Sequence, residues 1–421
     1  MFKVLSYSSV SITIKFAVGF LLTKILAYFL GPSGFALLGN FKNTAAVINS
    51  LTSLGMYKGI VRYTSESKNK IEEFQRLISA INLIAIISSL LIAVFLLFMA
   101  EQLSIFVLQD PSYAYLFQGL AVVLPFSTFQ IFFFSILNGL GNYKRVIGLE
   151  IMLNVCNLLI TTLFICKYGL SGALLSIIIL PIFYFLFTLF FLKKGVSNWL
   201  VFFKIKFNHF YGSQLGIYAL MTLFSGVTFP LIFIGIRNEI STIVNIQAAG
   251  YWEAVNQFSY FYFLAINSLL LMYGLPKITE NTSLETYQKL VKSYFLKLMP
   301  LFGLFLVALF FMREFAINLI LTDAFLPSES LFFWQLLGDY LRAATLVIVI
   351  LFHARRMIWH YILTDAVLAL MMYFFSVSLI QTLGVEGAVK GHFFSYFIYL
   401  CLIVITLRKE LFSSSSSLKS L

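Results

Sequence analysis

Long apolar runs follow one another along the whole chain, and each is about as long as a membrane-spanning helix. A span needs about 20 predominantly apolar residues, and short polar stretches separate the runs of this length. The pattern predicts twelve spans, which lie near residues 6–29, 35–57, 77–99, 114–137, 146–166, 171–192, 211–235, 248–273, 290–311, 328–352, 358–381 and 386–407. The chain is therefore predicted to be an all-α integral membrane protein.

Basic residues are distributed unevenly over the polar stretches. Most of the 29 Lys and Arg residues fall in every second connection and near the two ends. The remaining connections hold only Lys167, Arg237, Arg313 and Lys390. Because cytoplasmic loops carry the excess of Lys and Arg, both termini of this multi-pass protein are predicted to be cytoplasmic. The net charge of +12 then reports topology and contact with anionic membrane lipid, so nucleic acid is not expected as a partner.

Short motifs recur, in the same order, in the second half of the chain. "IEEFQRLI" (71–78) resembles "LETYQKLV" (284–291), 213 positions later, and the same interval separates Asp110 from Asp323. "YGLSGAL" (168–174) resembles "LGVEGAV" (383–389), 215 positions later. A further set of residues recurs at an interval of 216: Gly34, Asn40, Met56 and Tyr57 match Gly250, Asn256, Met272 and Tyr273. Ordered matches at nearly one interval indicate an internal repeat.

The repeat predicts two lobes of six transmembrane helices each. An even number of spans leaves both lobes the same way up, as a parallel repeat with a pseudo-two-fold axis along the membrane normal, an arrangement typical of transporters. The predicted organisation is an N-lobe at 1–192, a basic cytoplasmic linker at 193–210, a C-lobe at 211–408 and a cytoplasmic tail at 409–421. Part of the linker is expected to lie on the membrane surface.

Ionisable residues within the predicted spans differ in sign between the halves. The first half holds Lys15, Lys24 and Lys42, and the second half holds Glu253, Asp339, Arg342 and Asp365. Such residues are costly in a membrane and mark transport pathways. Cationic side chains suit an anionic headgroup such as a pyrophosphate. We therefore expect a substrate site in a central cavity that includes the three lysines and Arg342, and a site for a coupling ion, H⁺ or Na⁺, at one of the three carboxylates.

Structural explanations compete with these assignments. Lys24 lies near the end of its span and can extend to the interface, and Asp339 can pair with Arg342 three residues later on the same helix. Nine residues separate Lys15 from Lys24, which places them on opposite faces of a straight helix. We therefore expect Lys15 and Lys42 to face the cavity.

Signatures of other chemistry are missing from the sequence. The three cysteines have no spacing typical of disulfides or metal sites, and no P-loop, GxSxG or HExxH motif occurs. His392 is in a span and is expected to pack or to be hydrogen-bonded. We therefore expect no catalytic residue, no metal and no resident cofactor, and a transporter rather than an enzyme.

Local motifs resemble one family. "FLGPSGFALLGNF" (29–41) is similar to the first hairpin of Wzx-type flippases of the multidrug/oligosaccharidyl-lipid/polysaccharide exporter superfamily. "WQLLGDYLR" (334–342) resembles the tenth-helix motif of the O-antigen and common-antigen branch, with Arg342 in place of a lysine. The spacing of Lys15 and Lys24 also matches that branch.

The resemblance implies a function for the chain. Members of this family move an oligosaccharide on undecaprenyl pyrophosphate from the cytoplasmic to the periplasmic leaflet of the bacterial inner membrane, by alternating access and with a cation gradient. A polymerase and a chain-length regulator of lipopolysaccharide biosynthesis are the expected partners. Two alternatives stay open: a cation-coupled exporter of small molecules, and an integral membrane polysaccharide polymerase or acyltransferase. Short outer loops and the repeat favour a transporter over the enzymes.

Overall fold

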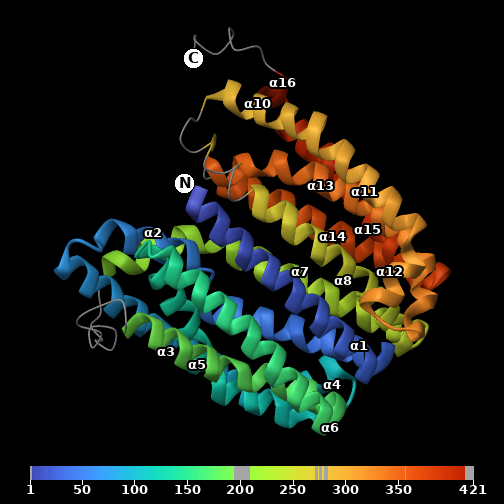
Figure 1. Cartoon of the computed structure of the whole chain (residues 1–421), viewed down its shortest axis with the longest axis horizontal. Coiled ribbons are helices and arrows are strands. Elements are labelled where there is room, and N and C mark those ends of the chain that lie inside the picture. Colours follow the sequence, from blue (N-terminus) through green and yellow to red (C-terminus); the bar gives the residue numbers. More distant parts are fainter. Residues whose placement is uncertain are drawn as a thin grey trace. The chain divides into compact units, whose positions relative to one another are not determined.

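The described chain consists of helices and short connections (Figure 1). The structure is a computed structural model, and it describes residues 2–193, 209–270, 274, 277–278, 283–355 and 357–412. Contacts divide the chain into two compact units: the first comprises Met1–Leu30 and Leu37–Ile234, and the second comprises Gly31–Ala36 and Gly235–Leu421. The all-helical class predicted from the sequence is confirmed.

The helices of the first unit follow the apolar runs. In chain order they are α1 (Phe2–Ser53), α2 (Tyr57–Ser67), α3 (Ile71–Phe98), α4 (Ala100–Leu108), the short 3₁₀ helix η1 (Pro111–Tyr113), α5 (Ala114–Gly139), α6 (Tyr143–Lys193) and most of α7 (His209–Ile243). α5 packs against both α3 and α6, and these three helices lie side by side in Figure 1. Their buried side chains form an apolar core that includes Phe74, Leu77, Phe132 and Leu149.

Two helices of the first unit are each long enough for two spans. α1 has 52 residues and α6 has 51, and each contains one glycine outside the helical region. These are Gly31 (φ 59°) and Gly169 (φ 56°), a conformation that L side chains rarely adopt. The sequence places a boundary between two spans near each glycine.

The second unit contains the remaining helices. They are α8 (Ile246–Leu269), α10 (Leu284–Ser293), the π-helical turn η4 (Tyr294–Leu298), α11 (Met299–Phe311), α12 (Arg313–Ile320), the 3₁₀ segment η5 (Asp323–Leu331), α13 (Phe332–Ala354), α14 (Ile358–Leu383), α15 (Val385–Thr406) and α16 (Arg408–Phe412). α15 packs against both α13 and α14. Two tyrosines link α10 and η4 to α13: the hydroxyl of Tyr287 donates to the carbonyl of Ile348, and the hydroxyl of Tyr294 donates to the carbonyl of Ala343.

Helix breaks occur at matching positions of the two units. Gly384, the counterpart of Gly169 in the repeat, separates α14 from α15 with φ 62° and ψ −142°, close to the φ 56° and ψ −132° of Gly169. The glycines that follow, Gly172 and Gly387, share a close approach as well, since a Cβ on either would overlap with the backbone of the preceding helix. Met99 and Met312, which also correspond in the repeat, have nearly the same conformation (φ −102°, ψ 12° and φ −99°, ψ 13°).

The number of spans stays a prediction. Within the described ranges, nine helices are long and apolar enough to cross a membrane, and α1 and α6 each count once among them. The expected span at 248–273 coincides largely with α8, which is not one of the nine. The boundary between the two contact units falls within α7, and the predicted division into lobes and linker stays a prediction. Most of that linker and the serine-rich end of the tail lie outside the described residues.

Candidate functional site

A buried carboxylate, Asp339, lies among α8, α13 and α15 of the second unit, and its side chain is 0% exposed. From α8, Ser259 donates its hydroxyl over 2.5 Å, and the hydroxyl of Tyr262 donates to the same oxygen. Gln335 donates from Nε2 over 3.3 Å, and Nε2 of His392 lies 3.1 Å from the other oxygen. Since a buried charge is costly unless it is paired and hydrogen-bonded, these four partners explain how a carboxylate is accommodated here.

The sequence of α13 shapes this cluster. Gln335 precedes Asp339 by four residues, so one helical turn places both on the same face. Gly338 is essential to the approach of α15, because a Cβ at this position would overlap with Cδ2 of His392. A glycine here therefore brings the imidazole within reach of the carboxylate.

Arg342 does not pair with Asp339, contrary to one explanation that the sequence left open. The basic side chain in contact with the carboxylate is that of His392, whose Nε2 lies 3.1 Å from Oδ1. The guanidinium of Arg342 lies over the ring of Phe263, 4.1 Å from its centroid, and 5.9 Å from that of Tyr396. Cation–π contacts hold the Arg342 guanidinium beside the cluster, and this guanidinium forms no direct ion pair with Asp339.

Asp365 is the second buried carboxylate of this unit. The hydroxyl of Tyr399 on α15 donates to it over 2.9 Å. The ring of Tyr399 lies 6.2 Å from that of Tyr396, which in turn lies 4.9 Å from the ring of His392. The aromatic residues His392, Tyr396 and Tyr399 of α15 therefore form a row between Asp339 of α13 and Asp365 of α14.

Glu253, the third candidate carboxylate, forms an ion pair with Arg237 of α7. Arg237 is 1% exposed and its guanidinium also lies 5.4 Å from the ring centroid of Trp252. The sequence predicts Arg237 in a connection between spans, whereas the residue lies inside α7 and is buried. Arg237 is thus the counter-ion of Glu253.

The three candidate lysines all lie on α1 in the first unit. Lys15 and Lys42 are exposed, and Lys24 is half-buried. Gly31 separates Lys15 and Lys24 from Lys42, so the lysines belong to both parts of this broken helix. Their predicted contact with substrate stays a prediction.

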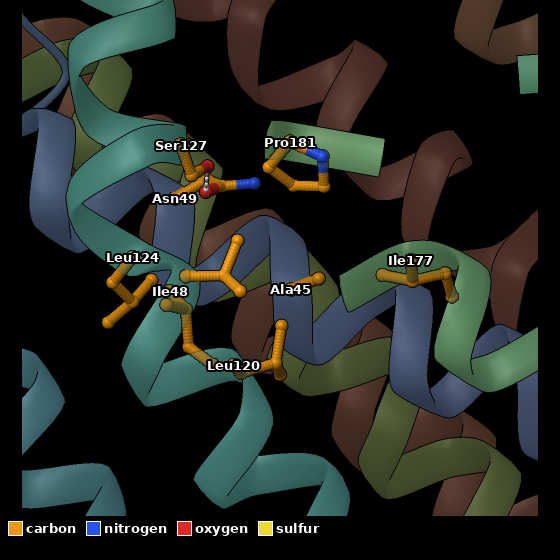
Figure 2. A pocket seen from close by; sticks show the side chains of 9 residues that line it. Ala45, Ile48, Asn49, Leu120, Leu124, Ser127, Ile177 and Pro181 are labelled. Carbon is orange, nitrogen blue, oxygen red and sulfur yellow. Dashed lines mark hydrogen bonds between the residues drawn. The ribbon is translucent and has the colours of Figure 1, made fainter. Parts of the chain in front are cut away.

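The first unit contains a small cavity that has no buried carboxylate among its described lining residues (Figure 2). Its volume is about 40 Å³, and most of its lining is apolar, including Ile48, Leu124 and Ile177. The polar contact drawn in the figure is a 2.6 Å hydrogen bond from the Ser127 hydroxyl to Oδ1 of Asn49. The cavity has room for a water molecule, but no ionisable side chain is among its described lining residues.

Residues that complete the Asp339 cluster were missed by sequence reasoning. Ser259 and Tyr262 are 80 and 77 positions from Asp339, and His392 is 53 positions away. No spacing rule joins helices at such distances.

No group of three or more His, Cys, Asp or Glu residues among the described ones is placed to hold a metal ion.

Comparisons with known proteins match a family model and named relatives over much of the chain. Residues 2–281 match the family described as polysaccharide biosynthesis protein. A protein named lipid III flippase from Escherichia coli (strain K12) is 24% identical over 400 residues, which cover 94% of this chain and 95% of that protein. Its namesake from Shigella flexneri matches equally well.

Solved structures show the same fold. An inward-facing multidrug resistance MATE family transporter of the MOP superfamily superposes with a TM-score of 0.80 at 12% identity, covering 95% of this chain and 96% of that one. The lipid II flippase MurJ in an inward closed conformation gives 0.69 at 15% identity, covering 98% and 89%. At such low identity, the likeness establishes architecture alone.

Proposed function

The chain belongs to the polysaccharide biosynthesis protein family, and we propose that it is a flippase that moves a lipid-linked oligosaccharide across a membrane. The relatives named lipid III flippase, which align over nearly their whole length, carry this conclusion. The chain is a transporter and not an enzyme. Apolar helices in both units support its place as a multi-pass membrane protein.

The substrate is an oligosaccharide on undecaprenyl pyrophosphate, carried from the cytoplasmic to the periplasmic leaflet of the bacterial inner membrane. Twelve spans in two parallel six-helix lobes would support alternating access to a site between the lobes. The matching helix breaks at Gly169 and Gly384 support this repeat. Both termini are cytoplasmic by the distribution of basic residues, and a polymerase and a chain-length regulator act on the product.

Cationic side chains would hold the headgroup. Lys15 and Lys42 are exposed on α1, which suits contact between their ammonium groups and a pyrophosphate. Lys24 serves at another depth. Arg342 is the cation that the second unit contributes, because its guanidinium is not neutralised by direct pairing with Asp339.

Asp339 is the coupling group that the geometry favours among the three carboxylates. Glu253 is already paired with Arg237, and a tyrosine hydroxyl donates to Asp365, whereas Asp339 lies beside an imidazole. The Asp339 oxygens receive hydrogen bonds from hydroxyl, amide and imidazole groups, whereas a hard metal cation prefers a shell of oxygen ligands. We therefore propose a proton, rather than Na⁺, as the coupling ion at this cluster.

Depletion in the native cell tests the function. Undecaprenyl-linked sugars are analysed by mass spectrometry, together with their accessibility from each face of the membrane. We expect a complete, pyrophosphate-linked oligosaccharide to accumulate facing the cytoplasm. If no such lipid accumulates and cells become sensitive to cationic drugs, the alternative of a small-molecule exporter replaces the proposal.

A further inference from the structure

An apolar groove runs along α11 and α13 of the second unit, which lie side by side in Figure 1. It encloses about 670 Å³ and extends over α11 from Pro300 to Phe311. At 1.5 Å per residue this is about 16 Å, roughly half the hydrocarbon thickness of a bilayer. Leu304 and Val307 form its wall on α11, and both side chains are exposed.

Aromatic side chains give the groove its width. Phe310, Phe311, Phe333 and Tyr340 contribute to the lining, and Gly303 leaves room in front of Tyr340 because it has no side chain. A groove of this composition in a membrane-spanning region takes a hydrocarbon chain.

A basic residue lies near each end of α11, and the two residues differ in whether a carboxylate lies beside them. Arg313 at one end donates to the carbonyl of Phe310 and lies 3.8 Å from a carboxylate oxygen of Glu329. Lys297, one turn before Pro300 at the other end, is exposed, and no carboxylate within the described residues forms an ion pair with it. Lys297 belongs to a π-helical turn, a feature frequent at functional sites. The groove therefore has one cationic end, which matches an anionic lipid with a long apolar tail.

The wall behind the groove connects it to the coupling centre. Phe302 and Phe305 of α11 pack against the ring of Tyr262, at centroid distances of 5.6 and 6.0 Å. The hydroxyl of that same tyrosine donates to Asp339. A hydrocarbon chain that fills the groove thus contacts α11, whose phenylalanines pack against Tyr262, a hydrogen-bond partner of Asp339.

We propose that the α11–α13 groove binds the isoprenoid units nearest the headgroup of the lipid-linked substrate during loading, with their phosphates beside Lys297 before the headgroup passes to Lys15, Lys42 and Arg342. The proposal rests on the proposed function for the identity of the lipid. It assigns the polyprenyl tail a protein site, so the tail is not merely dissolved in the surrounding bilayer during loading.

Binding to the purified full-length protein in lipid nanodiscs tests the groove. Undecaprenyl phosphate and phosphatidylglycerol serve as probes, and retention is measured by native mass spectrometry. Leu304→Trp and Val307→Trp fill the groove, and Leu301→Trp is the matched control, because Leu301 is similarly exposed on α11 but does not line the groove. We expect both groove variants to weaken undecaprenyl phosphate binding about tenfold, equal to about 1.4 kcal/mol, and the control to bind like the wild type.

Two results would overturn the groove. One is undecaprenyl phosphate binding that is unchanged in both groove variants; the other is phosphatidylglycerol competing on equal terms, as at an ordinary annular lipid site. Lys297→Gln is expected to weaken undecaprenyl phosphate binding and to leave binding of undecaprenol, which lacks the phosphate, unaffected. This binding assay does not involve transport, so the depletion experiment can fail while the groove stands, and the reverse also holds.

Discussion

The first unit has Phe126 at the position that corresponds to the buried Asp339 of the second unit. The two residues are 213 positions apart, the same interval as between Asp110 and Asp323. The position that matches His392, at the interval that joins Gly169 to Gly384, is Ile177, which lines the small cavity of Figure 2. Glu253 likewise corresponds to Leu37. One unit thus places aliphatic and aromatic side chains where the other places ionisable ones.

The backbone joints of the two units are nevertheless alike. Gly169 and Gly384 share a left-handed turn, and Met99 and Met312 share a helix break. Helix geometry is therefore common to both units, whereas the buried Asp339 cluster belongs to one. On the proposed function, the shared helix geometry is a scaffold and the Asp339 cluster of the second unit is the coupling centre.

Breaking the Arg237–Glu253 ion pair is expected to have the largest effect on stability. Glu253→Gln leaves a buried guanidinium without its counter-charge, and such a loss costs about 3–5 kcal/mol. Denaturation in detergent compares this variant with Leu37→Ala at the matching position. Replacing both members of the pair, as Arg237→Met with Glu253→Met, should recover part of the loss; a double variant no more stable than Glu253→Gln would contradict the buried pair.

Gly338→Ala is expected to destabilise the second unit by about 1–3 kcal/mol, the usual cost of overpacking. The added Cβ would overlap with the imidazole of His392 and would push it away from Asp339. Gly119→Ala in the first unit is the matched control, because its Cβ would meet only the end of the Ile178 side chain at 3.3 Å. Thermal unfolding measures both; equal melting temperatures would mean that α15 does not approach α13 this closely.

Ser127→Ala removes the hydrogen bond to Asn49 in the first unit and should cost about 1 kcal/mol. Transport should persist, because the cavity there has no ionisable group among its described lining residues. Ser259→Ala removes a single hydroxyl too, but one that contacts Asp339, so transport should fall. Transport assays on the two variants separate the units; similar losses in both would remove the distinction between scaffold and coupling centre.

Asp110 is expected to give the smallest effect, a shift in pH dependence. The backbone N–H of Ser112 donates to its side chain and lowers the pKa of Asp110 below the ordinary 3.8. Its contribution to stability is then complete above pH 3.8 and is lost as the pH falls through the lowered pKa. Melting temperature against pH should lose this acid-limb component in Asp110→Asn, and an unchanged profile would count against the capping contact.

The sequence predicts the helices well because hydropathy and length decide membrane spans. It also points to the break at Gly169 and its match at Gly384 through the paired motifs. Arg237 was misplaced because a charge near the end of an apolar run looks like a loop residue. The opposite charge of Glu253, on the next helix, was the signal that could have corrected this.

The partners of Asp339 had no such signal. His392, Ser259 and Tyr262 come from two other helices, and only tertiary packing brings them to the carboxylate. Sequence reasoning could identify Asp339 as costly and therefore meaningful, but its candidate partner was Arg342, the nearest opposite charge along the helix. Local spacing cannot reveal that aromatic rings from α8 and α15 hold Arg342 instead.

Proton coupling at Asp339 is tested most directly by flipping of a polyprenyl-linked oligosaccharide in proteoliposomes that contain the purified protein, with and without an imposed pH gradient. Asp339→Asn keeps the size of the side chain and removes its charge, and Phe126→Leu is the control at the matching position of the first unit. We expect the gradient to accelerate flipping by the wild type and by Phe126→Leu, and to have no effect on Asp339→Asn. Flipping by Asp339→Asn that responds to the gradient as the wild type does would contradict a coupling role for this carboxylate.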